Sequence, residues 1–242
     1  MNNNIIKTLY AIAIAISVTS CTIFDKLTDG GEAGDGKTLL TPDLALCQLQ
    51  GPVESVTCYT QYGEMRNGRF MAYDENSSTN FSYRLHFDRE GNFDQWTVLY
   101  DNRLIEWDKL RGPGRHTDED FTVERDSAGR ITSYIDKAPF GTSTTVINWN
   151  GMQRVGESNT TTYEELDDTE PYRSTSDISY GADGMTTSKT TNVLGPYPAS
   201  IYEEYGNYET DSHGNWTRRT VESVYDTFSN YCIETRKITY YQ

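Results

Sequence analysis

Polar and apolar residues alternate with a period of two over most of the chain after residue 50. Between Phe81 and Phe87, aromatic and aliphatic residues occupy every second position, and Ser82, Arg84 and His86 fill the positions between them. This alternation is typical of a β-strand with one apolar face. No later segment keeps a period of 3.6 residues for three turns. The sequence therefore predicts an all-β domain.

A short turn sequence separates the predicted strands. Its core is Asp-x-x-Gly, in which the Asp side chain caps the turn and Gly provides the positive φ at which the chain enters the next strand through a bulge. The turn or a variant of it occurs at Asp88 and Gly91, Asp126 and Gly129, Asn150 and Gln153, Gly181 and Gly184, and Asp211 and Gly214. Recurring turns of this kind predict an antiparallel meander of β-hairpins, which could form a sandwich, a barrel or an open sheet. We expect a curved open sheet or partial barrel.

One short helix is expected at the N-terminal end of the domain. Thr41 suits the N-cap, Pro42 suits the first helical position, and Asp43 places a carboxylate in the first turn. We expect this helix to cover part of one face of the sheet.

The turns and the strands around them resemble the YD repeats of the RHS family. Residues 49–56 (LQGPVESV) and 211–218 (DSHGNWTR) are similar to small YD-repeat-like lipoproteins of the Bacteroidota. The resemblance covers roughly residues 49–242, and the turns at Asn150 and Gly181 depart from the motif. It implies a sheet of β-hairpins, and most small members of the family have no assigned activity.

The first 21 residues have the pattern of an export signal. Lys7 is followed by an apolar run from Leu9 to Ile16, which is shorter than the roughly 20 residues that span a bilayer. Small polar residues and Cys21 come next. The segment resembles a bacterial lipoprotein signal, which implies cleavage before Cys21 and acylation of its thiol and new amino group. A plain signal peptide and a signal anchor are the alternatives.

Three parts of the chain follow from this pattern. We expect a signal peptide over residues 1–20, a lipidated Cys21 with a flexible Gly- and Asp-rich tether over 21–41, and the β domain over 42–242. Acyl chains would hold the mature chain on a membrane. In related lipoproteins an Asp after the cysteine favours the inner membrane, so Thr22 points to the outer membrane, at its periplasmic face or at the cell surface.

Three cysteines remain after processing. Cys47, Cys58 and Cys232 can form at most one disulfide and one free thiol. Pairing of Cys47 or Cys58 with Cys232 would join the two ends of the domain. The sequence contains no CxxC pair and its histidines are far apart, so we expect no metal and no cofactor.

The charge of the chain limits its partners. With 21 Lys and Arg against 36 Asp and Glu, the net charge is −15, which disfavours nucleic acid. No nucleophile elbow or phosphate-binding loop is present. Acidic runs at 118–120 and 164–170 lie between predicted strands and are expected to be solvated loops. Held in a cleft, such carboxylates could instead serve a glycosidase.

Aromatic residues provide the candidate ligand contact. Trp107 lies outside the repeat pattern and close to a Gly- and Pro-containing stretch, and an exposed ring there could stack on a sugar or peptide. Trp96 and Trp216 are expected to pack within the sheet. The sequence thus favours a membrane-anchored envelope lipoprotein that binds protein or polysaccharide without catalysing a reaction. The alternatives are a carbohydrate- or peptide-active envelope enzyme and a purely structural envelope protein.

Overall fold

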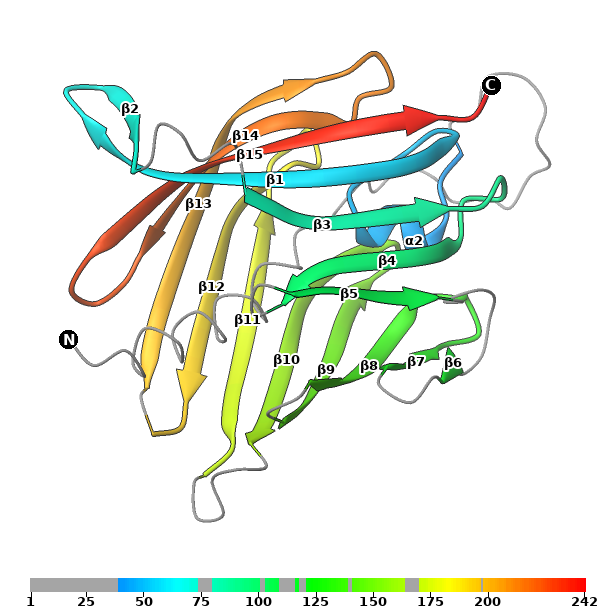
Figure 1. Cartoon of the computed structure of the whole chain (residues 1–242), viewed down its shortest axis with the longest axis horizontal. Coiled ribbons are helices and arrows are strands. Elements are labelled where there is room, and N and C mark those ends of the chain that lie inside the picture. The colour runs from blue at the N-terminus through cyan, green and yellow to red at the C-terminus, as the bar shows by residue number, and fades with distance from the viewer. Residues whose placement is uncertain are drawn as a thin grey trace.

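The computed structural model describes residues 39–73, 80–100, 103–108, 116–117, 121–138, 141–163, 170–196 and 198–242. These residues form one antiparallel sheet and one short helix, α2 (Pro42–Leu46). The sheet is curved and open, as the alternation and the turns predict (Figure 1).

The strands follow one another in a meander. In chain order they are β1 (Val53–Arg66), β2 (Arg69–Ala72), β3 (Asn80–Phe87), β4 (Phe93–Tyr100), β5 (Arg103–Asp108), β6 (His116–Thr117), β7 (Phe121–Arg125), β8 (Ile131–Ala138), β9 (Gly141–Asn150), β10 (Gln153–Tyr163), β11 (Tyr172–Tyr180), β12 (Thr186–Leu194), β13 (Ala199–Thr210), β14 (Trp216–Val224) and β15 (Ser229–Tyr240).

The first and last long strands lie side by side. β1 pairs with β15 on one side and with β3 on the other, and β2 pairs only with the end of β1. The sheet runs from β3 through β4 to the edge strand β5. At the other edge it begins at β6 and returns strand by strand to β15. Figure 1 shows β1 and β15, in cyan and red, next to each other along most of their length.

Four of the five predicted turns share one geometry. They contain Gly91, Gly129, Gly184 and Gly214, whose φ angles lie between 77° and 82°. In each turn the glycine N–H donates to the carbonyl oxygen three residues earlier, at 3.0 to 3.1 Å. The pairing register then shifts by one residue, which is the signature of a bulge. The predicted role of the glycine is therefore confirmed.

The turn at Asn150 is different, and its inclusion in the repeat was wrong. Asn150 pairs directly with Gln153, so only Gly151 and Met152 connect β9 to β10. The turn at Gly181, in contrast, belongs to the repeat although it lacks the leading Asp. There the Asp183 carboxylate accepts a hydrogen bond from the Met185 N–H at 3.0 Å. The backbone geometry is thus kept while the capping side chain moves by two residues.

Residues 39–52, which we call the N-terminal plug, include α2 and pack on one face of the sheet. Thr41 is the N-cap, and its hydroxyl accepts from the Leu44 N–H at 3.2 Å, as predicted. Leu39 packs against the core, so the folded domain begins no later than this residue. The face that the plug covers is called the inner face below.

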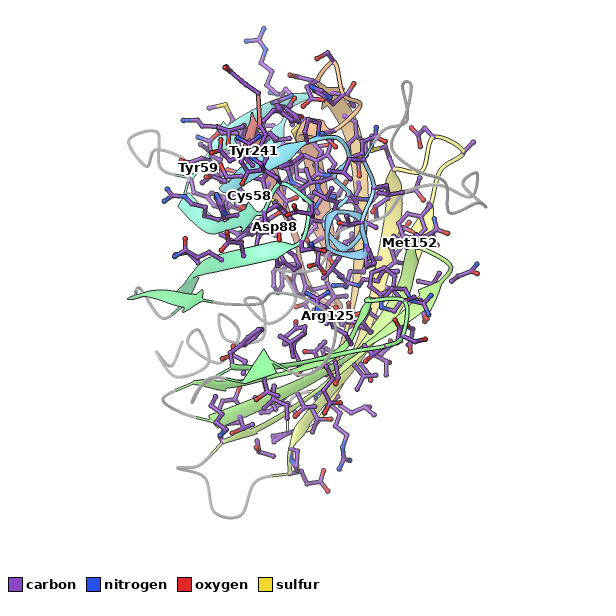
Figure 2. The ribbon with its side chains drawn as sticks, turned by 90° about the vertical axis from the view of Figure 1, so that its right-hand side faces the viewer. Cys58, Tyr59, Asp88, Arg125, Met152 and Tyr241 are labelled. Atoms are coloured by element: carbon purple, nitrogen blue, oxygen red, sulfur yellow. The ribbon has the colours of Figure 1, made fainter. Side chains whose placement is uncertain are left out.

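The main apolar core joins the two arms of the sheet through the plug. It contains residues of the plug, of β1, β3 and β4, and of β7 to β9: Leu44, Cys47, Leu49, Val53, Val56, Leu85, Phe87, Phe93, Phe121, Val123, Ile131 and Ile147. The sheet therefore curls until strands from opposite ends meet over α2. Figure 2 shows Arg125 between these two arms.

The plug also forms hydrogen bonds close to three of the repeat turns. The Thr41 hydroxyl donates to the carbonyl oxygen of Gly91 at 2.5 Å. Gln48 donates to Thr186 at 2.7 Å, and the backbone N–H of Gln50 donates to Asn215 at 2.8 Å. One short segment thus connects hairpins that are otherwise distant in the sheet.

The three cysteines of the domain are free and buried, so the disulfide considered from the sequence does not form. The register of β1 and β15 explains why. Cys58 pairs with Arg236, whereas Cys232 pairs with Tyr62, four residues further along β1. At about 3.3 Å per residue, this offset exceeds the Cα separation of roughly 7 Å that a disulfide tolerates.

Candidate functional site

The inner face is apolar beneath the plug but becomes polar towards the middle of the sheet. On β9 the residue at the edge of the core is Ile147, and at two-residue steps from it come Thr145 and Ser143. Neighbouring strands continue this change. We call the resulting set the hydroxyl belt: Ser143, Thr145, Asn159, Thr161, Ser174, Ser176 and Thr191.

Side chains of the hydroxyl belt bond to one another across the strands. The Asn159 amide donates to the hydroxyls of Ser143 and Thr145, at 2.6 and 2.9 Å. The hydroxyls of Ser176 and Thr191 lie 2.8 Å apart. Thr145, Ser176 and Thr191 are buried, whereas the other members are half-buried. The half-buried members are the ones that a ligand could contact.

Charged side chains occupy the inner face next to the belt. We call them the charged cluster: Arg154, Glu157, Lys189, Glu203, Arg219, Glu234 and Arg236. Glu157 lies within 2.7 Å of Arg154 and accepts from Lys189 at 3.1 Å. Buried ions need such partners, because a charge transferred from water to the interior is otherwise very unfavourable.

Trp216 lies at the centre of a second group of cations. The guanidinium carbons of Arg236 and Arg219 lie 3.6 and 4.2 Å from the centroid of the Trp216 ring. Arg219 also forms an ion pair with Glu234 at 2.5 Å. The indole N–H donates to Gln48 of the plug at 2.9 Å. Trp216 is therefore buried within the sheet, as predicted, and it contacts charged and polar groups.

Glu203 has a less complete set of partners than the other acids of the cluster. Its Oε2 atom is buried and has no hydrogen-bond partner among the described residues. Burial raises the pKa of its carboxyl, and nearby Lys189 lowers it in part. Glu203 is thus a carboxylate whose ionised form is poorly stabilised by the fold.

The buried thiols show no sign of activation. Burial raises the pKa of the Cys58 thiol to about 12, and it raises that of Cys232 well above the usual value. A nucleophilic cysteine needs the opposite shift, because the thiolate is the reactive form. These two residues act as small buried side chains.

The side chains of the sequence-predicted site residues lie almost entirely outside the described part of the chain. Cys21 and the acidic run at 118–120 are outside this part, as is the run at 164–170 except for the exposed Glu170. Trp107 lies on β5, where its backbone pairs with that of Trp96. The side chains of both tryptophans are outside the described part, so the stacking role of Trp107 stays a prediction.

Sequence reasoning missed the charged cluster because the bulges change the alternation. In the strand that follows each repeat turn, the first residue lies on the inner face, and the next inner-face residue comes three positions later instead of two. Thr186 and Lys189 follow this rule, and so do Trp216 and Arg219. Counting three positions instead of two from the residue after each turn would have placed Lys189 and Arg219 on the inner face.

Within the described ranges, no group of three or more His, Cys, Asp or Glu side chains is placed to hold a metal ion. Those ranges also contain no helix with the length and hydropathy of a membrane span. No known protein family, curated protein or solved structure matches the chain.

Proposed function

We propose that this chain is a lipid-anchored protein of the bacterial cell envelope that binds a neutral polysaccharide on the inner face of its sheet, without catalysing a reaction. The observation that carries the proposal is the hydroxyl belt. An ordinary sheet buries apolar side chains on its inner face, whereas this one places a row of hydroxyl and amide groups there.

The chemistry of the belt suits sugars. Each Ser or Thr hydroxyl both donates and accepts, and Asn159 adds two donors and an acceptor. Sugar hydroxyls have the same double capacity, so a polysaccharide can satisfy several belt residues at once. The net charge of −15 disfavours acidic polymers and leaves neutral ones.

Thr161 and Thr162 allow a matched test of this proposal. Both are on β10, but Thr161 belongs to the half-buried part of the belt and Thr162 is exposed on the other face. Thr161→Val keeps the shape and removes the hydroxyl, which leaves a sugar hydroxyl without its partner. We expect affinity to fall about tenfold, equivalent to about 1.4 kcal/mol, as measured by calorimetry.

The control for this experiment is Thr162→Val, which should bind as the unaltered chain does. The ligand is first sought on an array of neutral gluco-, manno- and galacto-oligosaccharides, with the whole chain purified in detergent. Absence of binding to all of them would favour the structural alternative. Turnover of a bound sugar would instead favour the alternative of a carbohydrate-active envelope enzyme.

Anchoring depends on Cys21 in this proposal, because the lipoprotein-like signal places the acyl chains there. We expect Cys21→Ser to move the chain from the membrane fraction to the soluble fraction and to remove the acyl mass seen by mass spectrometry of the intact protein. Thr22→Ser is the control and should stay anchored. A Cys21→Ser chain that remains membrane-bound, together with an unaltered chain of unmodified mass, would contradict lipidation.

A further inference from the structure

Glu203 lies at the border between the hydroxyl belt and the charged cluster. It is on β13 and pairs directly with Lys189 of the neighbouring strand β12. Lys189 comes two residues before the belt residue Thr191 on that strand. Lys189 directs its ammonium group to Glu157 at 3.1 Å. The inner face at this point therefore offers a carboxylate beside a row of hydroxyls.

What distinguishes Glu203 from Glu157 and Glu234 is that, among the described residues, its buried Oε2 atom has neither a hydrogen bond nor an ion pair. Glu157 and Glu234 each form an ion pair at 3.1 Å or less. In contrast, Oε2 of Glu203 is buried without a hydrogen-bond partner among the described residues. Most buried polar atoms in native proteins have a partner, and a buried carboxylate oxygen without one destabilises the fold.

Glutamine or an apolar residue at this position would avoid the cost of a buried charge. A side chain that is unfavourable for stability and lies in a candidate binding region is a reasonable functional residue, because binding sites often reduce stability. Glu203 as a whole is only half-buried. Rotation about its terminal torsion, which is broad in glutamate, is enough to redirect the two carboxylate oxygens.

We propose that Glu203 is a ligand-binding residue of the inner face, whose Oε2 atom accepts hydrogen bonds from the hydroxyl groups of a neutral sugar. This inference rests on the proposed function and specifies its chemistry. A carboxylate accepts hydrogen bonds only, so it orients the donating hydroxyls of the sugar, whereas the belt residues both donate and accept. A charge-assisted hydrogen bond of this kind is roughly twice as strong as a neutral one.

The groups around Glu203 determine how its charge responds to pH. Those that act on it or respond to it are Lys189 of β12, Tyr205 of β13, Arg219 of β14, Tyr225 of the following turn, and Cys232 and Glu234 of β15. Burial raises the pKa of the carboxyl above its unfolded value of about 4.3. The folded chain therefore binds this proton more tightly than the unfolded chain does. The protonated carboxyl is tolerated by the fold, whereas the ionised carboxylate destabilises it, and this destabilisation is complete once the pH has risen above the folded pKa.

The test compares Glu203→Gln with Glu204→Gln in the whole chain in detergent. The neighbouring Glu204 is exposed on the outer face of the same strand. We expect Glu203→Gln to weaken binding of the best neutral oligosaccharide at least tenfold while raising the thermal midpoint by a few degrees at pH 7. The gain in midpoint should disappear at about pH 3, below the unfolded pKa, where the carboxyl is protonated in both the folded and the unfolded chain. Glu204→Gln should change neither quantity.

The two measurements separate the possible failures. If the unaltered chain binds the oligosaccharide and Glu203→Gln binds it equally well, the role of Glu203 is wrong while the proposed function stands. If the unaltered chain binds none of the oligosaccharides, both are wrong. A lower thermal midpoint for Glu203→Gln would show that Glu203 stabilises the fold, which contradicts its proposed role as a binding residue that costs stability. Should this variant fail to fold, Glu203→Asp keeps the charge, shortens the side chain and should show the same loss of affinity.

Discussion

Replacing Asp43 with alanine is expected to destabilise the domain by about 3–5 kcal/mol, because it leaves a buried guanidinium without its partner. The side chains of Asp43 and Arg125 are only 2% and 4% exposed, and their ion pair measures 2.5 Å. Asp43 also accepts from the Phe93 N–H at 2.7 Å. One carboxylate in the plug therefore holds β4 and β7, which belong to opposite arms of the sheet. Chemical denaturation at neutral pH measures the loss.

Two variants test the assigned cause. The exposed ion pair of Glu209 and Arg218, whose side chains are 63% and 37% accessible, should contribute little, so Glu209→Ala should cost less than about 1 kcal/mol. The double variant Asp43→Asn with Arg125→Met removes both buried charges and keeps an acceptor for Phe93. It should be more stable than Asp43→Ala alone. Equal losses in the single and double variants would contradict the importance of the unpaired charge.

Replacing Trp216 with alanine is the second change with a large expected effect, about 3–5 kcal/mol. Trp216 is completely buried. Its loss would open a cavity, leave Gln48 without the indole donor, and remove the ring on which Arg219 and Arg236 lie. Cation–π contacts add to the burial term, since a desolvated pair contributes about 2 kcal/mol. The thermal midpoint and chemical denaturation measure the effect.

Trp216→Phe divides this loss into its parts. It keeps an aromatic ring beneath the arginines and removes only the N–H and some volume, so we expect about half of the effect. Phe228, which is 52% exposed, supplies the control, and Phe228→Ala should change stability by less than about 0.5 kcal/mol. Similar effects of Phe228→Ala and Trp216→Ala would show that the centre of the inner face is not where the fold is stabilised.

The sequence was sufficient to predict the local structure. The alternation around Phe87 and the Asp-x-x-Gly turns gave an all-β meander, and Thr41 with Pro42 gave the helix, because these signals depend on neighbouring residues. The turn at Asn150 was assigned wrongly because a two-residue hairpin can also follow an Asn with a Gly: here Asn150 ends β9, and Gly151 and Met152 form the connection. Local patterns of this kind are ambiguous when only a few residues define them.

The arrangement of the strands and the candidate site could not be predicted in the same way. Pairing of β1 with β15 joins residues that are far apart in sequence, and no local signal specifies it. Lys189 and Arg219 look like ordinary surface residues until the bulges before them are known. The unpaired Oε2 atom of Glu203 depends on the side chains of three neighbouring strands, so it becomes visible only in the folded structure.

The pairing of β1 with β15 also has a consequence for the order in which the domain is completed. Synthesis begins at the N-terminus, so the plug and β1 are made first. Yet β1 pairs with β15 from Val53 to Gly63, and Gln50 of the plug bonds to Asn215. The earliest segments must therefore wait for the latest ones, and in an incomplete chain β1 can pair with β3 while its other edge stays open. Completion of the sheet is thus tied to the arrival of its final strand, so a nascent or truncated chain lacks the support that joins its two arms.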